Sequence, residues 1–397
     1  MCLLVLCAVT ALAGERETIS GGGSLTPMEL LGARIFEDGS FSRPEGVSCA
    51  SCHDHAQAFQ GNNGSSVLAV ARGAPANSFG KRNTPSLMYA SFTPPFQFID
   101  DKDELTGHVE KKPIGGQFLD GRAATLADQF EDPLFDPHEM NAASKQAVVD
   151  AIRVGSYAGL ARKVFGNDIF ADSDQAFTKF SQAVAAFESS GRFHPFASKF
   201  DDYLRGKAQL TAVEQKGFAL FKDPKKGNCL ACHVGKETSR NPQDWLFTDY
   251  SYDVLGAPKN PAIPASVDVD LGLCRQPSIE KNKPVDFNVE TVCGAFKVPT
   301  LRNVAITAPY FHNGFFTKLR DVVAFYATRD TDPKRWYPLS KTGETEKFND
   351  LPKQYHNNVN VAEAPYDRKL RQRPRLTQKE VTAITFFLET LTDRRRE

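Results

Sequence analysis

The sequence predicts a mainly α protein built from two similar domains, and two observations lead to this prediction. Apolar residues recur at helical spacing in six segments, which cover residues 26–36, 144–154, 173–187, 211–221, 317–326 and 377–391. A Cys-x-x-Cys-His motif occurs twice, and each copy is followed by a related segment, at 82–87 and at 298–303. This internal echo indicates a duplicated module. We expect an N-terminal domain over residues 24–205 and a C-terminal domain over residues 206–392.

The first predicted helix has a clear start, because Thr26 is a good N-cap residue and Pro27 suits the first helical position. Long connections rich in Pro, Gly and Asn separate the helices, notably 61–95 and 241–297. Loops of that length are uncommon in simple domains. They are less surprising where a bound cofactor supplies part of the core.

The charges of the chain cancel, with 48 basic and 48 acidic side chains. A neutral chain has no general electrostatic attraction for nucleic acid or for an anionic membrane surface. We therefore predict that neither is a partner.

The N-terminus predicts export. Residues 1–13, MCLLVLCAVTALA, form an apolar run that ends in small residues, which is typical of a signal peptide; a buried N-terminal segment is the alternative. No other apolar run approaches the roughly 20 residues that a membrane-spanning helix needs, so we predict a periplasmic protein with no membrane span. In such an oxidising compartment, Cys274 and Cys293 are a candidate disulfide pair.

The two motifs predict covalent haem. Two thiols three residues apart on one helical turn can add to both vinyl groups of a haem, and the next residue then points its imidazole at the iron. His53 and His233 are the predicted iron ligands of two haem c groups. The predicted attachment residues are Cys49, Cys52, Cys229 and Cys232. A thioredoxin-like redox pair or a zinc site could explain one such motif, but two complete motifs in an exported chain favour haem.

The ligand on the opposite face of each haem decides its chemistry, because a six-coordinate iron transfers electrons whereas an open iron can react with peroxide. Methionine is the usual sixth ligand in electron-transfer c-type haems, but none of the four methionines follows the second motif. The candidates at the second haem are Tyr326, His312 and His356, along with several other tyrosines. At the first haem, His55 lies too near His53, and His108 is the only loop histidine that could fold over. An open first iron is the simpler interpretation.

The chain resembles the bacterial diheme cytochrome c peroxidases and their relative, the diheme enzyme of methylamine utilisation that oxidises tryptophans on a partner protein. Besides both haem motifs, the segments that carry this resemblance are 31–36, 82–86, 120–122, 139–140, 296–303 and 309–314. The resemblance covers nearly the whole chain after residue 13. It implies a mainly α fold of two c-type cytochrome domains, each with one covalent haem, packed face to face.

The resemblance also implies roles for individual residues. Glu139 matches the acid in the pocket beside the first haem, and Gln129 and Pro133 match its neighbours. Tyr326 falls where the peroxidases carry an axial methionine and where the methylamine-utilisation relative carries tyrosine. A calcium ion between the domains is implied by Asn83, Thr307 and Pro309, whose side-chain and carbonyl oxygens suit this hard cation.

Two positions depart from the family pattern. Ala69 stands where peroxidases that need reductive activation carry a histidine over the first iron, so we expect that iron to be open in the fully oxidised protein. Leu119 stands where the family usually has a tryptophan between the haems. An aliphatic side chain cannot hold a radical, so either another aromatic residue relays charge or electrons tunnel directly between the haems.

These observations predict a peroxide-dependent diheme oxidoreductase. Hydrogen peroxide would react at the first haem with help from Glu139 and Gln129, and a small cytochrome c or cupredoxin would supply electrons. The alternatives are peroxide-driven oxidation of aromatic residues on a partner protein and a pure electron carrier with two six-coordinate irons. Trp245 and Trp336 are ordinary packing residues or surface electron ports. The basic run 368–375 is a solvated face or a docking edge for an acidic donor.

Overall fold

The structure is a computed structural model, and it describes residues 24–102, 107, 109–264 and 269–394. The predicted signal peptide at 1–13 and His108 lie outside the described residues.

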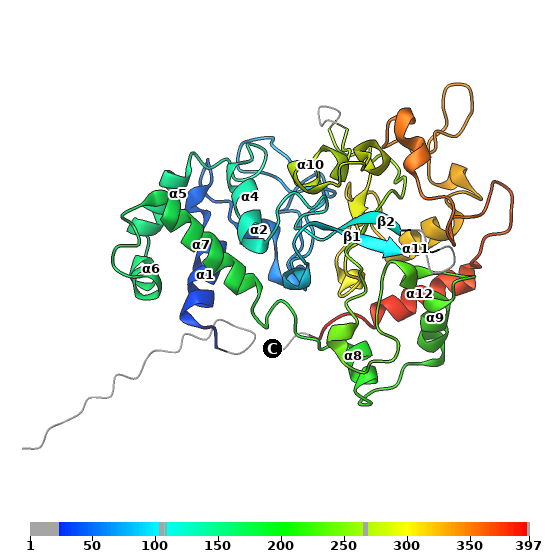
Figure 1. The fold of residues 1–397 in the computed structure, drawn as a ribbon, viewed down its shortest axis with the longest axis horizontal. Helices are drawn as coiled ribbons and strands as arrows, with labels where there is room; N and C mark the ends of the chain where they lie inside the picture. Colours follow the sequence, from blue (N-terminus) through cyan, green and yellow to red (C-terminus); the bar gives the residue numbers. More distant parts are fainter. Residues whose placement is uncertain (1–23, 103–106, 108, 265–268, 395–397) are drawn as a thin grey trace, which may run out of the picture.

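The described chain is mainly helical, as predicted. Its helices are α1 (Pro27–Glu37), α2 (Cys49–Cys52), α3 (Leu126–Gln129), α4 (Glu131–Phe135), α5 (Lys145–Val154), α6 (Ala158–Phe165), α7 (Ser173–Glu188), α8 (Lys199–Leu204), α9 (Ala212–Lys222), α10 (Pro277–Asn282), α11 (Leu319–Thr328) and α12 (Gln378–Glu389). All six predicted helical segments are confirmed. Helices α1 to α7 gather at one end of the molecule, and α8, α9, α11 and α12 gather at the other (Figure 1).

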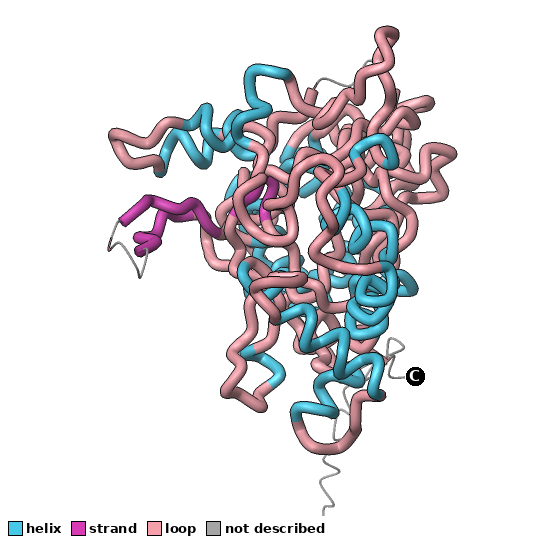
Figure 2. The backbone as a smooth tube through the Cα atoms, turned by 90° about the vertical axis from the view of Figure 1, so that its right-hand side faces the viewer, coloured by secondary structure: helices cyan, strands magenta, loops and turns pink. Residues whose placement is uncertain are grey.

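Two short antiparallel sheets complete the fold. Strands β1 (Gln97–Lys102) and β2 (Val109–Ile114) form a hairpin that extends from one side of the molecule (Figure 2), and β3 (Tyr252–Asp253) pairs with β4 (Phe296–Lys297). The sequence analysis did not predict this hairpin.

Each half of the molecule is built around one close crossing of two helices. A glycine in α1, Gly32, lies so close to α7 that a Cβ atom there would be 1.9 Å from the Ala183 carbonyl oxygen. Gly217 in α9 makes the same approach to α12, where a Cβ atom would be 2.0 Å from the Ala383 carbonyl oxygen. Glycine inside a helix costs up to about 1 kcal/mol of stability relative to alanine. At both positions this cost allows the two helices to pack more closely than any larger residue would permit. The two crossings have similar geometry, and each lies in one of the two predicted domains.

The two crossings lie in separate hydrophobic cores. The N-terminal core includes Phe36, Phe180 and Phe187, and the C-terminal core includes Phe221 and Phe387. Both are dominated by aromatic rings in edge or tilted contact, as between Phe36 and Phe187. The abundant phenylalanine of the sequence is therefore used largely for packing.

Buried polar contacts stabilise the C-terminal half, to which α8 belongs, and join it to the N-terminal half. The fully buried Arg302 donates to Asp201 at 2.8 and 3.0 Å and also to the carbonyl oxygens of Trp245 and Pro242. Because both carboxylate oxygens are engaged, the buried charge of Arg302 is compensated. Near the C-terminus, Asp393 accepts hydrogen bonds from Tyr89 of the N-terminal half and from Asn303.

The candidate pair Cys274 and Cys293 forms a disulfide, which closes part of the long 241–297 connection. The four cysteines of the two motifs are not disulfide-bonded. Within the described residues, no helix is both long and apolar enough to cross a bilayer.

The helix crossing gives a stability prediction. Gly32→Ala should destabilise the folded protein by roughly 1–3 kcal/mol, because the new methyl group must displace backbone rather than a flexible side chain. The measurement is thermal unfolding of the haem-loaded protein followed by circular dichroism. Gly159→Ala in α6 is the matched control, since a Cβ atom there meets nothing within 4 Å, and it should leave the Tm unchanged or raise it. Equal Tm values for both variants would contradict the account.

Candidate haem sites

The first motif presents its side chains from a single helical turn. Cys49 and Cys52 begin and end α2, and His53 follows directly. The ring nitrogen Nδ1 of His53 lies 2.8 Å from the carbonyl oxygen of Phe59. A carbonyl only accepts, so Nδ1 carries the proton and Nε2 keeps its lone pair for a metal. Burial lowers the pKa of His53 to about 4, which keeps the imidazole neutral.

The second motif repeats this geometry. Cys229 begins a short 3₁₀ turn, and Nδ1 of His233 lies 3.0 Å from the carbonyl oxygen of Phe247. Burial also lowers the pKa of His233. Both histidines are therefore oriented by a backbone carbonyl, which is the arrangement that an iron-binding imidazole needs.

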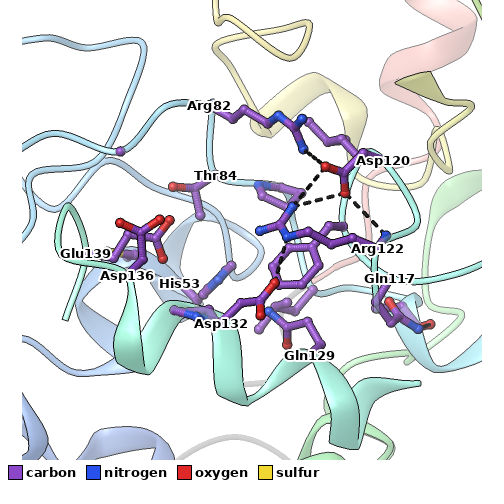
Figure 3. A pocket seen from close by; sticks show the side chains of 18 of the residues that line it. His53, Arg82, Thr84, Gln117, Asp120, Arg122, Gln129, Asp132, Asp136 and Glu139 are labelled. Carbon is purple, nitrogen blue, oxygen red and sulfur yellow. Dashed lines mark hydrogen bonds and ion pairs between the residues drawn. The ribbon is translucent and has the colours of Figure 1, made fainter. Parts of the chain in front are cut away.

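A cavity of about 800 Å³ adjoins the first motif. His53, Gln129, Pro133 and Glu139 all line it, so the structure brings together the predicted residues of the first site. In Figure 3, Glu139 lies on one side of His53, and Gln129 lies on the other. The cavity has the size of a site for a large ligand and places two cysteines and a neutral imidazole at its wall, so these residues fit a covalent haem.

Glu139 is the ionisable group best suited to proton transfer in this cavity. Burial raises its pKa to about 7, and the neighbouring carboxylate of Asp136 adds to the effect, whereas Arg122 opposes it. A pKa near the working pH allows a carboxyl group both to accept and to return a proton.

Ion pairs hold the cavity wall in place on the side of the C-terminal half. Arg82 donates one hydrogen bond to Asp120 at 2.5 Å. It also donates two hydrogen bonds, of 2.5 and 2.7 Å, to the carboxylate of Asp270. Arg122 pairs with Asp120 and with Asp132 (Figure 3). Because Asp270 belongs to the long 241–297 connection, four residues before the disulfide at Cys274, this network joins that connection to the N-terminal half.

Sequence reasoning missed three polar residues of the cavity, the buried Glu188 and the half-buried Lys297 and Tyr250. Burial raises the pKa of Glu188 to about 8, and its Oε2 atom has no hydrogen-bond partner. Burial lowers the pKa of Lys297 to about 7, and its ammonium group donates to the carbonyl oxygen of Gly116. The sequence indicates the burial of Glu188 only by its position, directly after the predicted helix at 173–187 and on the apolar face of that helix.

The two departures from the family pattern occupy different places. Leu119 lines the cavity, whereas Ala69 is buried and is not among its lining residues. Near Leu119 the wall also carries the ring of Tyr250, whose neighbour Asp249 donates its backbone N–H to the carbonyl oxygen of Cys232 at 3.0 Å. Tyr250 thus connects the wall of the first cavity with the second motif.

Tyr326 lies on α11 within reach of the second motif. Burial raises the pKa of its phenol, and the negative charges of Asp253 and of the Cys232 and Cys229 thiolates would raise it further. Its ring lies 5.6 Å from the ring of Tyr366, a neighbour that the sequence analysis did not identify. The other two candidates have different partners: His312 is 2.9 Å from Asp350, and His356 is 2.9 Å from the carbonyl oxygen of Leu351.

Two of the three predicted calcium residues meet between the halves. The side-chain amide of Asn83 donates to the carbonyl oxygen of Pro309 at 2.6 Å and to that of Phe311 at 3.3 Å. The third, Thr307, lies two residues before Pro309, and its hydroxyl donates to Val304. Gln60 adds an unexpected feature, since its Nε2 donates to Asn83 while its buried Oε1 has no partner. No cluster of three or more His, Cys, Asp or Glu suitable for a metal occurs among the described residues.

A mainly α fold with two Cys-x-x-Cys-His motifs, each beside an oriented and buried imidazole, defines a diheme c-type cytochrome. Comparisons with known proteins show to which family of such cytochromes the chain belongs. Residues 27–209 match the family model described as di-haem cytochrome c peroxidase. The methylamine utilization protein MauG of Paracoccus denitrificans is 34% identical over 403 residues, covering 100% of this chain and 96% of that protein. The chain therefore belongs to the diheme cytochrome c peroxidase and MauG family, and is an oxidoreductase that binds two haem c groups.

Other relatives agree with this assignment. The cytochrome c551 peroxidase of Nitrosomonas europaea is 28% identical and covers 81% of this chain and 80% of that protein. Among solved structures, the diheme peroxidase BthA of Burkholderia thailandensis is 39% identical with a TM-score of 0.83, covering 92% of this chain and 86% of that one. The predicted fold class and family resemblance are confirmed.

Proposed function

We propose that this chain reduces hydrogen peroxide at an open first haem and shares oxidising equivalents with a second haem ligated by His233 and Tyr326. The observation that carries the proposal is the cavity that His53, Glu139 and Gln129 all line. Cys49 and Cys52 would attach the first haem, and Cys229 and Cys232 the second. The bound haem would supply the iron at which peroxide is reduced.

Glu139 has the proton-transfer role in this proposal. Its ionised carboxylate accepts a proton from one peroxide oxygen and returns it to the other, so that water can leave. Gln129 holds the peroxide or a water molecule by hydrogen bonds. Each cycle consumes one hydrogen peroxide, two electrons and two protons and produces two water molecules.

The side chains around the cavity support an open first iron. Met88 and Met140 also border the cavity, but both belong to the N-terminal hydrophobic core. His138, on the same wall, is half-exposed and lies 3.2 Å from Asp136. These contacts leave the space beside His53 to the substrate.

Tyr326 is the proposed second ligand of the C-terminal iron. A ferric iron would supply the positive charge that a buried phenolate requires, and Arg329 already acts on the phenol in that direction. An anionic oxygen ligand stabilises the ferric state and so lowers the reduction potential of that haem.

A calcium ion between the halves is part of the proposal. Rotation of the Asn83 amide would place Oδ1 on the side of the Pro309 and Phe311 carbonyl oxygens, and rotation of the Gln60 amide would turn its unpartnered oxygen toward Asn83. Neutral carbonyl and amide oxygens are suitable calcium ligands. We include Thr307 through its backbone, as the family resemblance implies.

We further propose that residues 1–13 direct export to the periplasm and that the domain boundary lies at 205–206. Along this stretch of chain the N-terminal core ends with Phe196, and Phe200 and Leu204 of α8 already pack in the C-terminal core, so the change of core falls a few residues before this boundary. The electron donor would be a small cytochrome c or cupredoxin.

A second candidate function is oxidation of aromatic residues on a partner protein, and its support is the full-length match to MauG. The two functions differ in the source of the electrons that reduce peroxide. Oxidation of a partner changes the mass of the partner's aromatic side chains, whereas peroxide reduction consumes two equivalents of reduced donor.

Glu139→Gln tests the proton-transfer role. Peroxide turnover should fall by roughly 10²–10⁴-fold, the usual contribution of a positioned acid–base group. Turnover of the unmodified protein should rise as the pH increases through about 7, because Glu139 must be ionised to accept a proton, and the variant should lose this rise. A pure electron carrier would show no effect. Asp136→Asn is the matched control: it should keep turnover but move the inflection to lower pH, since Asp136 helps to raise the pKa of Glu139.

Tyr326→Met tests the second ligand. Replacing an anionic phenolate by a neutral thioether should raise the reduction potential of the C-terminal haem by on the order of 0.1 V or more. Spectroelectrochemical titration measures this shift. Tyr366→Phe, which changes the adjacent ring without removing it, should leave the ligand-field bands of that haem in place. Identical potentials for the Tyr326 variant and the unmodified protein would rule out Tyr326 as a ligand.

Calcium removal tests the site between the halves. Chelation should lower the Tm of the haem-loaded protein, and calcium at 100 times its Kd should restore about 2.7 kcal/mol of stability, whereas magnesium should not. Gln60→Leu is the variant that best distinguishes a site with bound calcium from one without it. Without an ion, it removes an unsatisfied buried oxygen but also the hydrogen bond from Nε2 to Asn83, so the two effects oppose each other and the change in Tm should be small; with an ion, it should weaken calcium binding and lower the Tm.

A further inference from the structure

One strongly charged surface is unused by the catalytic proposal. Residues 368–375 carry five basic side chains and no acidic one, and we name this segment with Lys225 the basic rim. Lys369, Arg371 and Arg373 are exposed and have no ion-pair partner within the described part of the chain, as is true of Lys225. Leu370, between them, is 59% exposed.

The basic rim lies beside the second haem motif. Arg375 donates to the backbone carbonyl oxygen of Lys225 at 3.4 Å, and Asn228, which precedes Cys229, donates to the carbonyl oxygen of Ala364 at 3.2 Å. Tyr366, just before the rim, packs against Tyr326. The segment therefore runs from the proposed iron ligand to the loop that carries the haem cysteines, next to α9 and α12 (Figure 1).

The acidic groups nearby do not neutralise this surface. Asp367 pairs with Arg375, and Glu380 pairs with Lys226. The carboxylate of Asp223 accepts the backbone N–H of Lys225 and so lies at that end of the rim, but among the described residues no acidic side chain is ion-paired with Lys369, Arg371 or Arg373. Since the whole chain has no net charge, the positive potential is local to the second haem site rather than general.

We propose that the basic rim is the docking surface for a small acidic one-electron carrier protein that delivers electrons to the C-terminal haem. The inference rests on the proposed function. Complementary charge accelerates encounter and orients the carrier, and the exposed Leu370 provides an apolar contact within the charged surface. Two carriers each give up one electron for every peroxide reduced.

The test uses the haem-loaded full chain with Arg371→Glu and Arg373→Glu combined. The probe is reduced plastocyanin, an acidic cupredoxin, and a basic mitochondrial cytochrome c is its counterpart. The matched control combines Lys163→Glu and Lys179→Glu, which make the same charge change on exposed residues of α6 and α7 in the other half. Hydroquinone, an uncharged small reductant, measures peroxide turnover that needs no docking.

We expect kcat/KM for plastocyanin to fall about 10-fold or more in the rim variant at low salt and its salt dependence to flatten. The kcat/KM of the control variant should stay within about twofold of the unmodified protein, and the basic cytochrome should react faster with the rim variant.

Equal losses in both variants, or no loss in either, would overturn the proposal. Rim-dependent binding to anionic phospholipid vesicles with unchanged plastocyanin kinetics would instead assign the rim to a membrane. Absence of hydroquinone turnover in the unmodified protein would refute the peroxidase function itself.

Discussion

The hydrogen bond from each motif histidine to a backbone carbonyl is the constraint on which the rest of the structure depends. It fixes the tautomer of His53 and of His233 and therefore decides which ring nitrogen is available for iron. The carbonyl groups are supplied by Phe59 and Phe247, whose rings pack into the N-terminal and C-terminal cores. The helix crossings at Gly32 and Gly217 build these cores, so the packing of each half is tied directly to the orientation of its imidazole.

Charge is distributed unequally around the two sites. The cavity beside His53 contains two carboxyl groups, Glu139 and Glu188, whose pKa values burial raises, and one lysine, Lys297, whose pKa burial lowers. All three can change protonation near neutral pH, which suits a site that must move protons. The second site lies among tyrosines, Arg329 and the carboxyl group of Asp253, whose pKa burial also raises. Our proposal assigns peroxide chemistry to the first site because the cavity there brings Glu139 and Gln129 together with His53.

The sequence predicted the helices and the haem motifs because their signals are local. Helical periodicity and Cys-x-x-Cys-His spacing each span a few turns, and the family resemblance supplied Glu139, Gln129 and Tyr326. The hairpin of β1 and β2 escaped prediction because its residues are mostly exposed, so no alternation of apolar and polar side chains marks it. The contact of Tyr366 with Tyr326 joins residues forty positions apart, and the burial of Glu188 appears only when α7 packs. Such contacts depend on tertiary structure and leave no pattern in the sequence.

The most direct test of the central claim is rapid mixing of the fully oxidised protein with hydrogen peroxide while the haem absorption is recorded. An open first iron predicts a prompt spectral change without any prior reduction. A spectrum that stays constant until one haem has been reduced would contradict the account, because it would show that a protein side chain occupies the position assigned to peroxide.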